Sequence, residues 1–240
     1  MLSNKIAVIT GSGSGIGAAT ARIFVRENVA GIAIVDYNYE AACKVAEELG
    51  PVALPVKCDV SNPEQVEAAI AQIIEKFGRI DILVNNAAIT RDAIFHKMTP
   101  DQWHAVINTN LNSVFYTCRC VVERMRAQNS GRIINISSTS ILGNPGQANY
   151  AAAKSGMIGF TKTIAKELGR KTITVNCVAP GATNTEMYMN VPQEIRDAVA
   201  KNKPFGRLGE PMEVANTVSF LASDDASYVS GQVISVTGGS

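Results

Sequence analysis

The sequence predicts a single α/β domain in which helices cover both faces of a parallel, doubly wound sheet of about seven strands. Apolar segments of strand length alternate with segments of helical character along the chain, a pattern typical of such sheets. No linker, repeat or low-complexity segment interrupts it, and 240 residues with 46% hydrophobic content suit one core better than two. We therefore expect one domain spanning residues 1–240.

The expected elements follow one another in chain order. Strands are predicted at 5–9, 31–35, 52–56, 82–84, 133–136, 174–178 and 233–236. Helices are predicted at 18–25, after Tyr39, and at 63–77, 99–125 and about 150–171. Thr99 followed by Pro100 favours a helix start, with threonine as the N-cap and proline in the first turn. Asn110 would then lie inside a helix.

A glycine-rich turn separates the first predicted strand from the first helix. Glycines permit positive φ and a close approach of the backbone to a ligand, and a helix N-terminus directs N–H groups at phosphate oxygens. This context favours a cradle for the pyrophosphate of a dinucleotide, with a purely structural turn as the alternative. The expected contacts are Gly11, Ser12, Gly13, Ser14, Gly15, Ile16 and Gly17.

Asp36 ends the second predicted strand, nineteen residues beyond Gly17. A carboxylate at this place in a dinucleotide-binding unit accepts hydrogen bonds from the adenosine ribose. It would repel a 2′-phosphate, and neither Ser14 nor Tyr37 supplies a cation to offset the repulsion. We therefore expect Asp36 and Tyr37 beside the ribose, and NAD(H) in preference to NADP(H). The alternative is that Asp36 caps the helix after Tyr39.

Tyr150 and Lys154 are four residues apart, so they share one face of a helix. A free phenol titrates near pH 10, and a neighbouring ammonium would lower that pKa by stabilising the phenolate. The pair therefore indicates an acid/base site beside a nucleotide. Taken alone, the same spacing also fits an ordinary surface or packing pair.

Together these motifs resemble those of short-chain dehydrogenases/reductases, over essentially the whole chain. The resemblance implies a single-domain Rossmann fold, and the segments around Arg91, Tyr150, Asn176 and Gly231 are most similar to 3-oxoacyl-ACP reductases and acetoacetyl-CoA reductases. The residues that carry it are Thr10-Gly11-x-x-x-Gly15-x-Gly17, Asn85-Asn86-Ala87, Asn110, Ser138, Tyr150-x-x-x-Lys154 and Pro180-Gly181.

The resemblance also implies catalytic roles. Tyr150 would protonate the oxygen of a ketone, and Lys154 would hold the ribose and lower the pKa of Tyr150. Asn110 would support a proton relay, although a polar surface residue is the alternative. The carbonyl-polarising hydroxyl is expected to be Ser138 when the preceding strand is the anchor, whereas the commoner family spacing before Tyr150 selects Ser137.

Further cofactor contacts are expected after later strands. Asp59 and Val60 resemble an adenine-binding pair, and Asn86 and Ala87 would lie along the adenosine ribose, unless Asn85-Asn86 is a simple turn. Pro180, Gly181, Thr183 and Thr185 resemble the segment that meets the nicotinamide. Residues 186–207 are expected to form a substrate lid, with a helical pair that merely caps the core as the alternative.

Charge and composition exclude several other classes. A formal net charge of +1 gives no basic field for nucleic acid, and no apolar run reaches the roughly 20 residues of a membrane span. The five scattered cysteines and two histidines suggest neither disulfides nor a metal site. Met1–Lys5 lead directly into the first strand, so we expect no cleaved signal sequence and a cytoplasmic location. The resemblance implies a homotetramer.

The substrate is predicted only as a class. The resemblance favours reduction of a 3-oxoacyl thioester to the 3-hydroxyacyl thioester, carried by acyl carrier protein or by CoA. Asn129-Ser130 stand where acyl-carrier reductases often have basic residues, and Asp36 disfavours the usual NADPH, so a CoA thioester is comparably favoured. Sugars, polyols and hydroxysteroids remain alternatives, as does a non-catalytic NAD-sensing protein.

Overall fold

The computed structural model describes residues 2–240 and contains one seven-stranded sheet in which all strands are parallel. The strand order is β3-β2-β1-β4-β5-β6-β7, so the predicted doubly wound α/β architecture is confirmed. The seven strands are β1 (Ile6–Thr10), β2 (Gly31–Asp36), β3 (Ala53–Lys57), β4 (Ile82–Asn85), β5 (Gly131–Ile136), β6 (Ile173–Pro180) and β7 (Val233–Val236).

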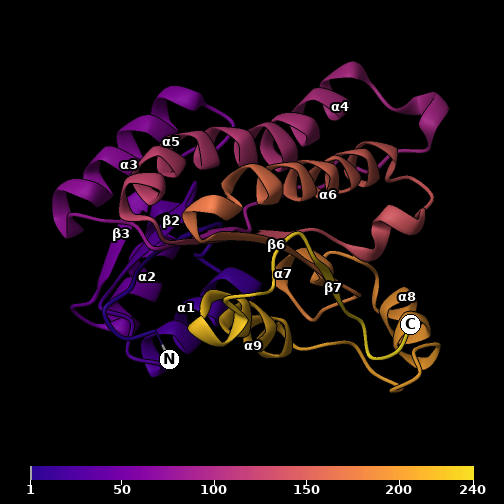
Figure 1. Ribbon diagram of the computed structural model, residues 1–240. Helices are drawn as coiled ribbons and strands as arrows, with labels where there is room; N and C mark the ends of the chain where they lie inside the picture. Colours follow the sequence, from indigo (N-terminus) through magenta and orange to yellow (C-terminus); the bar gives the residue numbers. More distant parts are fainter. Residues whose placement is uncertain (1) are drawn as a thin grey trace.

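Helices cover both faces of this sheet (Figure 1). One layer contains α3 (Pro63–Phe77), α4 (Pro100–Ile107), α5 (Ser113–Gln128) and α6 (Ala148–Leu168). The other contains α1 (Gly15–Arg26), α2 (Tyr39–Leu49) and α9 (Pro211–Ala222). Each layer closes its own apolar core, because the strand residues are buried on both faces and alternate between the two layers.

The order of the strands reverses between β1 and β4, which pair in parallel register. Chain segments leaving these two strands turn to opposite faces, and a crevice opens outside their carboxyl ends. The glycine-rich turn follows β1 and the segment beginning at Asn86 follows β4, so both predicted motifs reach this crevice. The topology therefore places the candidate site before any side chain is considered.

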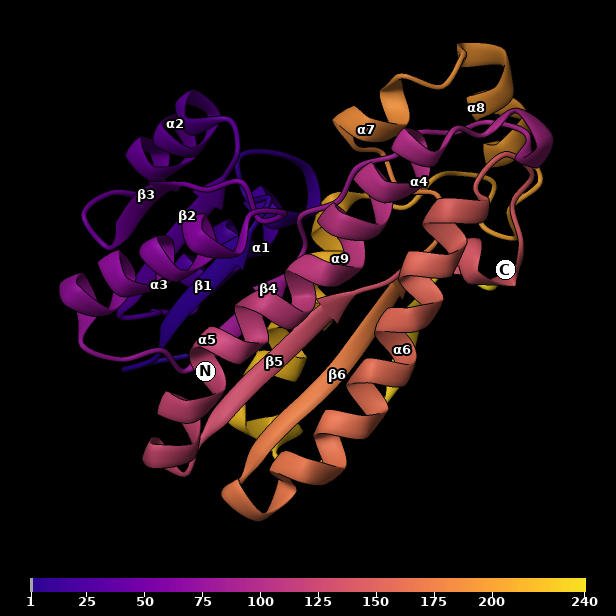
Figure 2. The same ribbon diagram turned by 90° about the horizontal axis from the view of Figure 1, so that it is seen from above.

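The predicted helix over 99–125 is not one regular α-helix. Thr99 forms the expected N-cap with Pro100 in the first turn, but residues Asn108–Asn112 form a π-helical turn between α4 and α5. Figure 2 shows the three pieces as one long rod beside α6. The wider turn changes the backbone hydrogen-bond register without ending the helix, and apolar periodicity does not reveal such a change.

Two other boundaries differ from the prediction. The helix expected from about Tyr150 to Lys171 begins at Ala148 and ends at Leu168, and a 3₁₀ turn over Gly169–Lys171 follows. Residues after β6 form two short helices, α7 (Glu186–Met189) and α8 (Gln193–Lys201). Pro192 directly precedes α8, and its fixed φ suits the entry to a helix.

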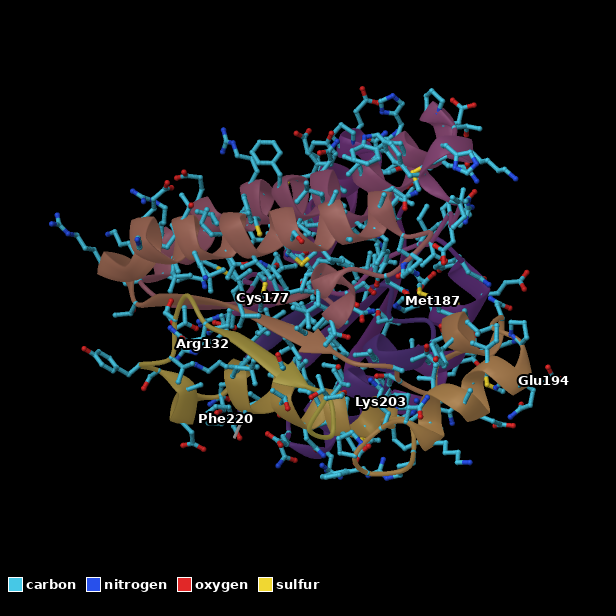
Figure 3. All side chains as sticks on the ribbon, turned by 90° about the vertical axis from the view of Figure 1, so that its right-hand side faces the viewer. Arg132, Cys177, Met187, Glu194, Lys203 and Phe220 are labelled. Atoms are coloured by element: carbon cyan, nitrogen blue, oxygen red, sulfur yellow. The ribbon has the colours of Figure 1, made fainter. Side chains whose placement is uncertain are left out.

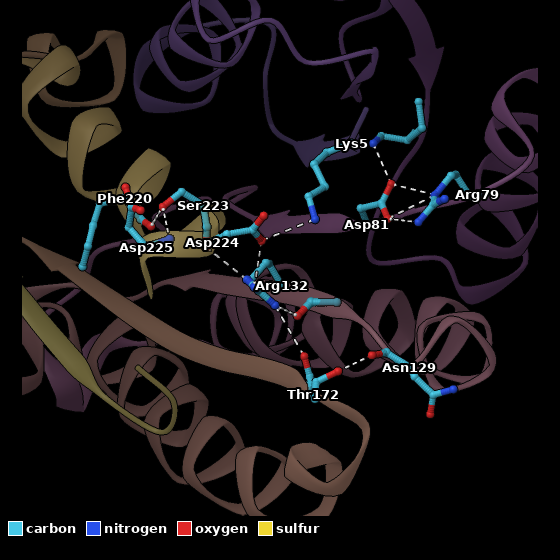
Figure 4. Close-up of polar contacts among 12 residues, drawn as sticks. Lys5, Arg79, Asp81, Asn129, Arg132, Thr172, Phe220, Ser223, Asp224 and Asp225 are labelled. Carbon is cyan, nitrogen blue, oxygen red and sulfur yellow. Dashed lines mark hydrogen bonds and ion pairs between the residues drawn. The ribbon is translucent and has the colours of Figure 1, made fainter. Parts of the chain in front are cut away.

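At the amino ends of the strands, a cluster of charged side chains ties distant segments together (Figure 4). Asp81, which precedes β4, pairs with Arg79 at 2.6 Å and accepts a hydrogen bond from the N–H of Ile6 at 2.8 Å. Asp224, after α9, pairs with Lys5 at 3.4 Å and Arg132 at 3.1 Å. This cluster lies at the opposite end of the sheet from the crevice, so it stabilises the fold without entering the site.

Candidate active site

A cleft of about 1040 Å³ opens at the carboxyl ends of the strands. Its walls come from the segments that follow β1 to β6, from the first turns of α6, and from residues 186–203. Most of the residues predicted from the sequence line this one cleft: Gly11, Ser14, Gly15, Ile16, Asp36, Tyr37, Asp59, Val60, Asn86, Ala87, Ser138, Tyr150, Lys154, Pro180, Gly181, Thr183 and Thr185.

Four predicted residues do not line the cleft. The buried Ser12 hydroxyl donates to the carbonyl of Ile9 at 2.7 Å, and the Gly13 N–H donates to Asp36. A Cβ on Gly17 would come within 2.4 Å of the Gly11 carbonyl oxygen. The fourth, Asn110, is fully buried. Ser12, Gly13 and Gly17 thus give the turn its shape, while their neighbours face the cleft.

The glycine turn has the form of an anion cradle. Gly11 and Gly15 have φ of +62° and +54°, in the left-handed region, and a Cβ on Gly11 would lie 2.7 Å from the Cα of Ala87. Ser14, the N-cap of α1, makes no side-chain capping hydrogen bond. The first N–H groups of this twelve-residue helix are therefore not capped by that side chain and point at the cleft. The residues present fit the pyrophosphate of a dinucleotide.

Asp36 is held at the carboxyl end of β2. Its Oδ2 atom accepts from the Gly13 N–H at 2.8 Å, and its Oδ1 atom accepts from the Asn38 N–H at 2.9 Å. Asn38, not Asp36, caps α2, because its side chain accepts from the N–H of Ala41. The alternative interpretation of Asp36 as the cap of this helix is therefore wrong.

Asn86 fixes the segment after β4 to the glycine turn. Its side-chain amide donates to the carbonyls of Thr10 and Gly11, at 3.0 and 2.8 Å. The Thr10 hydroxyl accepts from the N–H groups of Asn86 and Ala87, both at 3.1 Å. These bonds join two strands across the switch point, so the asparagine does more than favour a local turn.

Lys154 is buried in α6, with 1% of its surface exposed. Its Nζ atom donates to the Ile136 carbonyl at 2.6 Å and lies 5.6 Å from the centre of the Tyr150 ring. No ion pair joins it to a carboxylate within residues 2–240. Burial lowers the pKa of Lys154 to about 8, because removal from water disfavours the ammonium form.

The predicted lowering of the Tyr150 pKa is not what the structure shows. Burial raises the pKa of Tyr150 to about 12, a hydrogen bond with Ser138 acts in the opposite direction, and the negative charge of Asp92 adds to the rise. Loss of water around the phenolate is thus the largest influence on this pKa. The expectation was wrong in direction because spacing along a helix reports proximity but not burial.

The two neighbouring serines have different surroundings. Ser137 is 2% exposed, and its hydroxyl donates to the main-chain carbonyl of Lys154 at 3.0 Å. The Ser138 hydroxyl is hydrogen-bonded to the Ser140 hydroxyl at 3.1 Å, and its bond with Tyr150 acts on the pKa of that phenol. Ser137 therefore anchors α6, whereas Ser138 is the serine beside Tyr150.

Asn110 lies in the π-helical turn and is fully buried. Its side-chain amide donates to the Ile89 carbonyl and accepts from the Ile89 N–H, both at 2.9 Å. The alternative interpretation as polar surface is therefore wrong. The side chain is committed to holding the segment after β4, while the preceding residue, Thr109, lines the cleft.

Among the polar cleft residues without an assigned role in the sequence interpretation are Asp92, Ser140 and Gln147. They come from loops that lack periodicity, so no sequence pattern brings them together. In the sequence, the only indication of a role for them is that Asp92 and Gln147 lie in segments that resemble those of the family.

Residues 186–203 form the outer wall of the cleft. Met187, Tyr188, Val191, Ile195 and Val199 contribute apolar surface there. Figure 3 shows Met187 and Glu194 toward one end of the molecule and Arg132 and Phe220 toward the other. The wall therefore lies beyond the carboxyl ends of the strands, over the region where a substrate would enter.

The described residues 2–240 contain no helix long and apolar enough to cross a membrane. The same part of the chain contains no group of three His, Cys, Asp or Glu side chains able to hold a metal ion.

A family model described as enoyl-(acyl carrier protein) reductase matches residues 11–240. The chain is 46% identical to the 3-oxoacyl-[acyl-carrier-protein] reductase of Thermotoga maritima, with 99% of this chain and 98% of the relative covered. It is 45% identical to the acetoacetyl-CoA reductase of Shinella zoogloeoides, with 98% of each covered. The crystal structure of levodione reductase superimposes with a TM-score of 0.95 at 35% identity, covering 99% of this chain and 98% of that one.

Proposed function

Because the chain belongs to the short-chain dehydrogenase/reductase family and is therefore an oxidoreductase, we propose that it reduces 3-oxoacyl thioesters to 3-hydroxyacyl thioesters with NADH. The observation that carries this proposal is the convergence of Tyr150, Lys154 and Ser138 on a cleft that also contains the glycine turn. The same groups would catalyse the reverse oxidation, since each step is reversible.

The polar groups of the cleft suit a developing alkoxide. The phenol of Tyr150 is protonated near neutral pH, so it can donate a proton to the ketone oxygen. Ser138 can donate a second hydrogen bond to the same oxygen, and the Lys154 ammonium stabilises the negative charge. The glycine turn would hold the pyrophosphate of the cofactor and residues 180–185 its nicotinamide, which would supply the hydride.

Asp36 supports NAD(H) over NADP(H). The basic residues of the cleft wall are Arg91, Lys154 and Lys203, none of which belongs to the segments after β2 and β3. Asp36 and Asp59 make that end of the cleft acidic, so a 2′-phosphate would meet two carboxylates. Lys57 stands opposite Asp36 in the β2–β3 register but forms no ion pair with it within residues 2–240.

The relatives support a thioester substrate. Two are named for acyl-carrier and CoA thioesters, and a third, from Thauera aromatica, is a subunit of a CoA-thioester dehydrogenase that is 41% identical. The apolar wall at residues 187–199 offers surface for an acyl chain. We propose that residues 186–207 as a whole form a lid over the acyl chain of the substrate. Another ketone is the second candidate, because the levodione reductase fold matches this chain closely.

We also propose a cytoplasmic homotetramer. Phe115 on α5 and Phe220 on α9 are large apolar side chains with 52% and 42% of their surface exposed, and Tyr228 before β7 is fully exposed. Nothing lies within 4 Å of the position of a Cβ on Gly159, so this part of α6 is open to close packing. All five cysteines are free thiols, which fits a reducing compartment. Sedimentation showing a monomer at micromolar concentration would contradict the assembly.

The function is tested by the initial rate of NADH oxidation with acetoacetyl-CoA. We expect turnover that is slower with NADPH and that Tyr150→Phe abolishes, while NADH binding stays measurable. Comparing an acyl carrier protein substrate under the same conditions identifies the carrier. No turnover with any 3-oxoacyl thioester would overturn the proposed substrate and direct the search to other ketones.

A further inference from the structure

A continuous chain of hydrogen bonds leads from Ser138 to the mouth of the cleft. Ser138 Oγ is bonded to Ser140 Oγ at 3.1 Å, and Ser140 Oγ donates to Gln147 Oε1 at 3.0 Å. Gln147 Nε2 donates in turn to Asp92 Oδ2 at 2.9 Å. The members come from three separate segments, namely the loop after β4, the 3₁₀ turn after β5 and the residue before α6.

Asp92 determines which group donates and which accepts in each bond of this hydrogen-bond series. An ionised carboxylate can only accept hydrogen bonds, so it faces the amide NH₂ group of Gln147 and turns the Oε1 atom toward Ser140. Asn144 Nδ2 donates to the same Oε1 atom at 2.8 Å, which favours the same orientation. Since Oε1 is also only an acceptor, Ser140 must give it its single proton.

The consequence reaches Ser138. Ser140 has then no proton left for Ser138, so its oxygen accepts from the Ser138 hydroxyl. The N–H of Ser140 donates to Ser138 Oγ at 3.1 Å and fixes that oxygen from the other side. The Ser138 proton is thereby held within the cleft at a neutral acceptor, and a charged oxygen is a better acceptor than a neutral hydroxyl. The arrangement favours transfer of this hydrogen bond to a developing alkoxide over a ground-state ketone.

We propose that Asp92, Gln147 and Ser140 are positioning residues that set the direction of the Ser138 hydroxyl for transition-state stabilisation. This inference rests on the proposed function in that Ser138 acts on a ketone oxygen. None of the three touches that oxygen, and each acts only through Ser138.

A double-mutant cycle tests this dependence. Ser140→Ala and Gln147→Ala are each expected to lower kcat about tenfold and to lower KM as well. The released Ser138 hydroxyl then also stabilises the ground-state ketone, so the transition state gains less over it. In a Ser138→Ala background, the same substitutions are expected to have no further effect. Asp101→Asn removes an acidic group on α4, outside the cleft, and serves as the charge control for Asp92→Asn. Equal losses of kcat in both backgrounds would overturn the proposal.

A second readout needs no substrate, so it separates this inference from the proposed function. The two groups that act on the Tyr150 pKa besides burial are Ser138, which lowers it, and Asp92, which raises it, and Lys154 is the ammonium beside the ring. We expect NMR of ¹³Cζ-labelled tyrosine to show a lower Tyr150 pKa in Ser140→Ala, because the Ser138 proton is released from Ser140 and can donate to the phenolate. A lower Tyr150 pKa is also expected in Asp92→Asn, because a nearby negative charge is lost. Tyr150→Phe assigns the resonance. A Ser140→Ala effect that persists without Ser138 would contradict the chain even if no thioester is reduced.

Discussion

Buried charged side chains are paired at one end of the parallel sheet and unpaired at the other. At the amino ends, Asp81 is 2% exposed and is paired with Arg79 and with a backbone N–H. At the carboxyl ends, Lys154 is equally buried, but its ammonium has only a carbonyl oxygen as partner among residues 2–240, and its pKa is lowered by burial. A paired charge stabilises a fold, whereas a buried charge without a counter-ion is costly and is retained where chemistry needs it. The difference separates the stabilising end of this molecule from its reactive end.

The largest expected effect is at Tyr150. Tyr150→Phe removes the only atom of the side chain that can donate a proton, so kcat should fall by about 10³-fold or more. The ring remains to fill its place, so the melting temperature should change little. Steady-state kinetics and thermal unfolding of the same preparation check both statements. Turnover within tenfold of the parent enzyme would remove Tyr150 from the acid/base role.

Lys154→Met tests how the buried, unpaired ammonium of Lys154 affects turnover and the free energy of unfolding. We expect kcat to fall by about 100-fold, because an ammonium that stabilises the alkoxide is lost. The folded pKa of about 8 lies below the ordinary value of 10.5, so between these limits the unfolded chain binds a proton that the folded protein has released. The contribution of Lys154 to the free energy of unfolding of the parent should therefore increase as pH rises from 8 to 10.5.

Methionine does not titrate, so this gain should be absent from Lys154→Met. Urea unfolding at pH 7.5, 9 and 10.5 measures the difference between the two proteins. A difference that stays constant over this interval would mean that Lys154 keeps an ordinary pKa, and the contrast between the two ends would fail.

Asp81→Ala removes the buried carboxylate of the charged cluster at the amino ends of the strands. It leaves the Ile6 N–H without its acceptor and Arg79 without its carboxylate, so we expect a loss of about 3 kcal/mol in the free energy of unfolding. The KM for NADH should not change, because the cluster lies at the far end of the sheet. Denaturant unfolding and kinetics at low temperature check the two parts. A large change in KM with little loss of stability would show that the ends are not independent.

Sequence patterns predicted the fold better than the chemistry of the site. Each strand is an apolar run, and parallel strands buried on both faces need little else to be recognised. The π-helical turn at Asn108–Asn112 has no such signature, because a change of hydrogen-bond register leaves the residue types unchanged. Seventeen predicted site residues line the cleft, since motif spacing fixes their places on strands and helices.

The spacing of motifs in the sequence could not predict the surroundings of the side chains in the site. The Tyr150 pKa moves upward because the phenol loses water within the cleft, and a four-residue separation from Lys154 contains no information about that loss. Likewise, Ser140, Gln147 and Asp92 meet only after three loops have folded over the cleft. Such contacts depend on tertiary structure and have no local pattern.

The smallest expected effect concerns the acidic end of the cleft at Asp36. Asp36→Ser should raise kcat/KM for NADPH relative to NADH by about tenfold, because the carboxylate that repels a 2′-phosphate is gone and no cation replaces it. Part of the NADH efficiency should also be lost, since the Gly13 N–H loses its carboxylate acceptor and the glycine turn is less firmly held. Lys57→Ala is the matched control, as Lys57 stands opposite Asp36 in the sheet but does not line the cleft. An unchanged cofactor ratio in Asp36→Ser would show that selection lies elsewhere. If the ratio shifts in Lys57→Ala instead, the cofactor end contains an active cation, and the carboxylates alone do not define its charge.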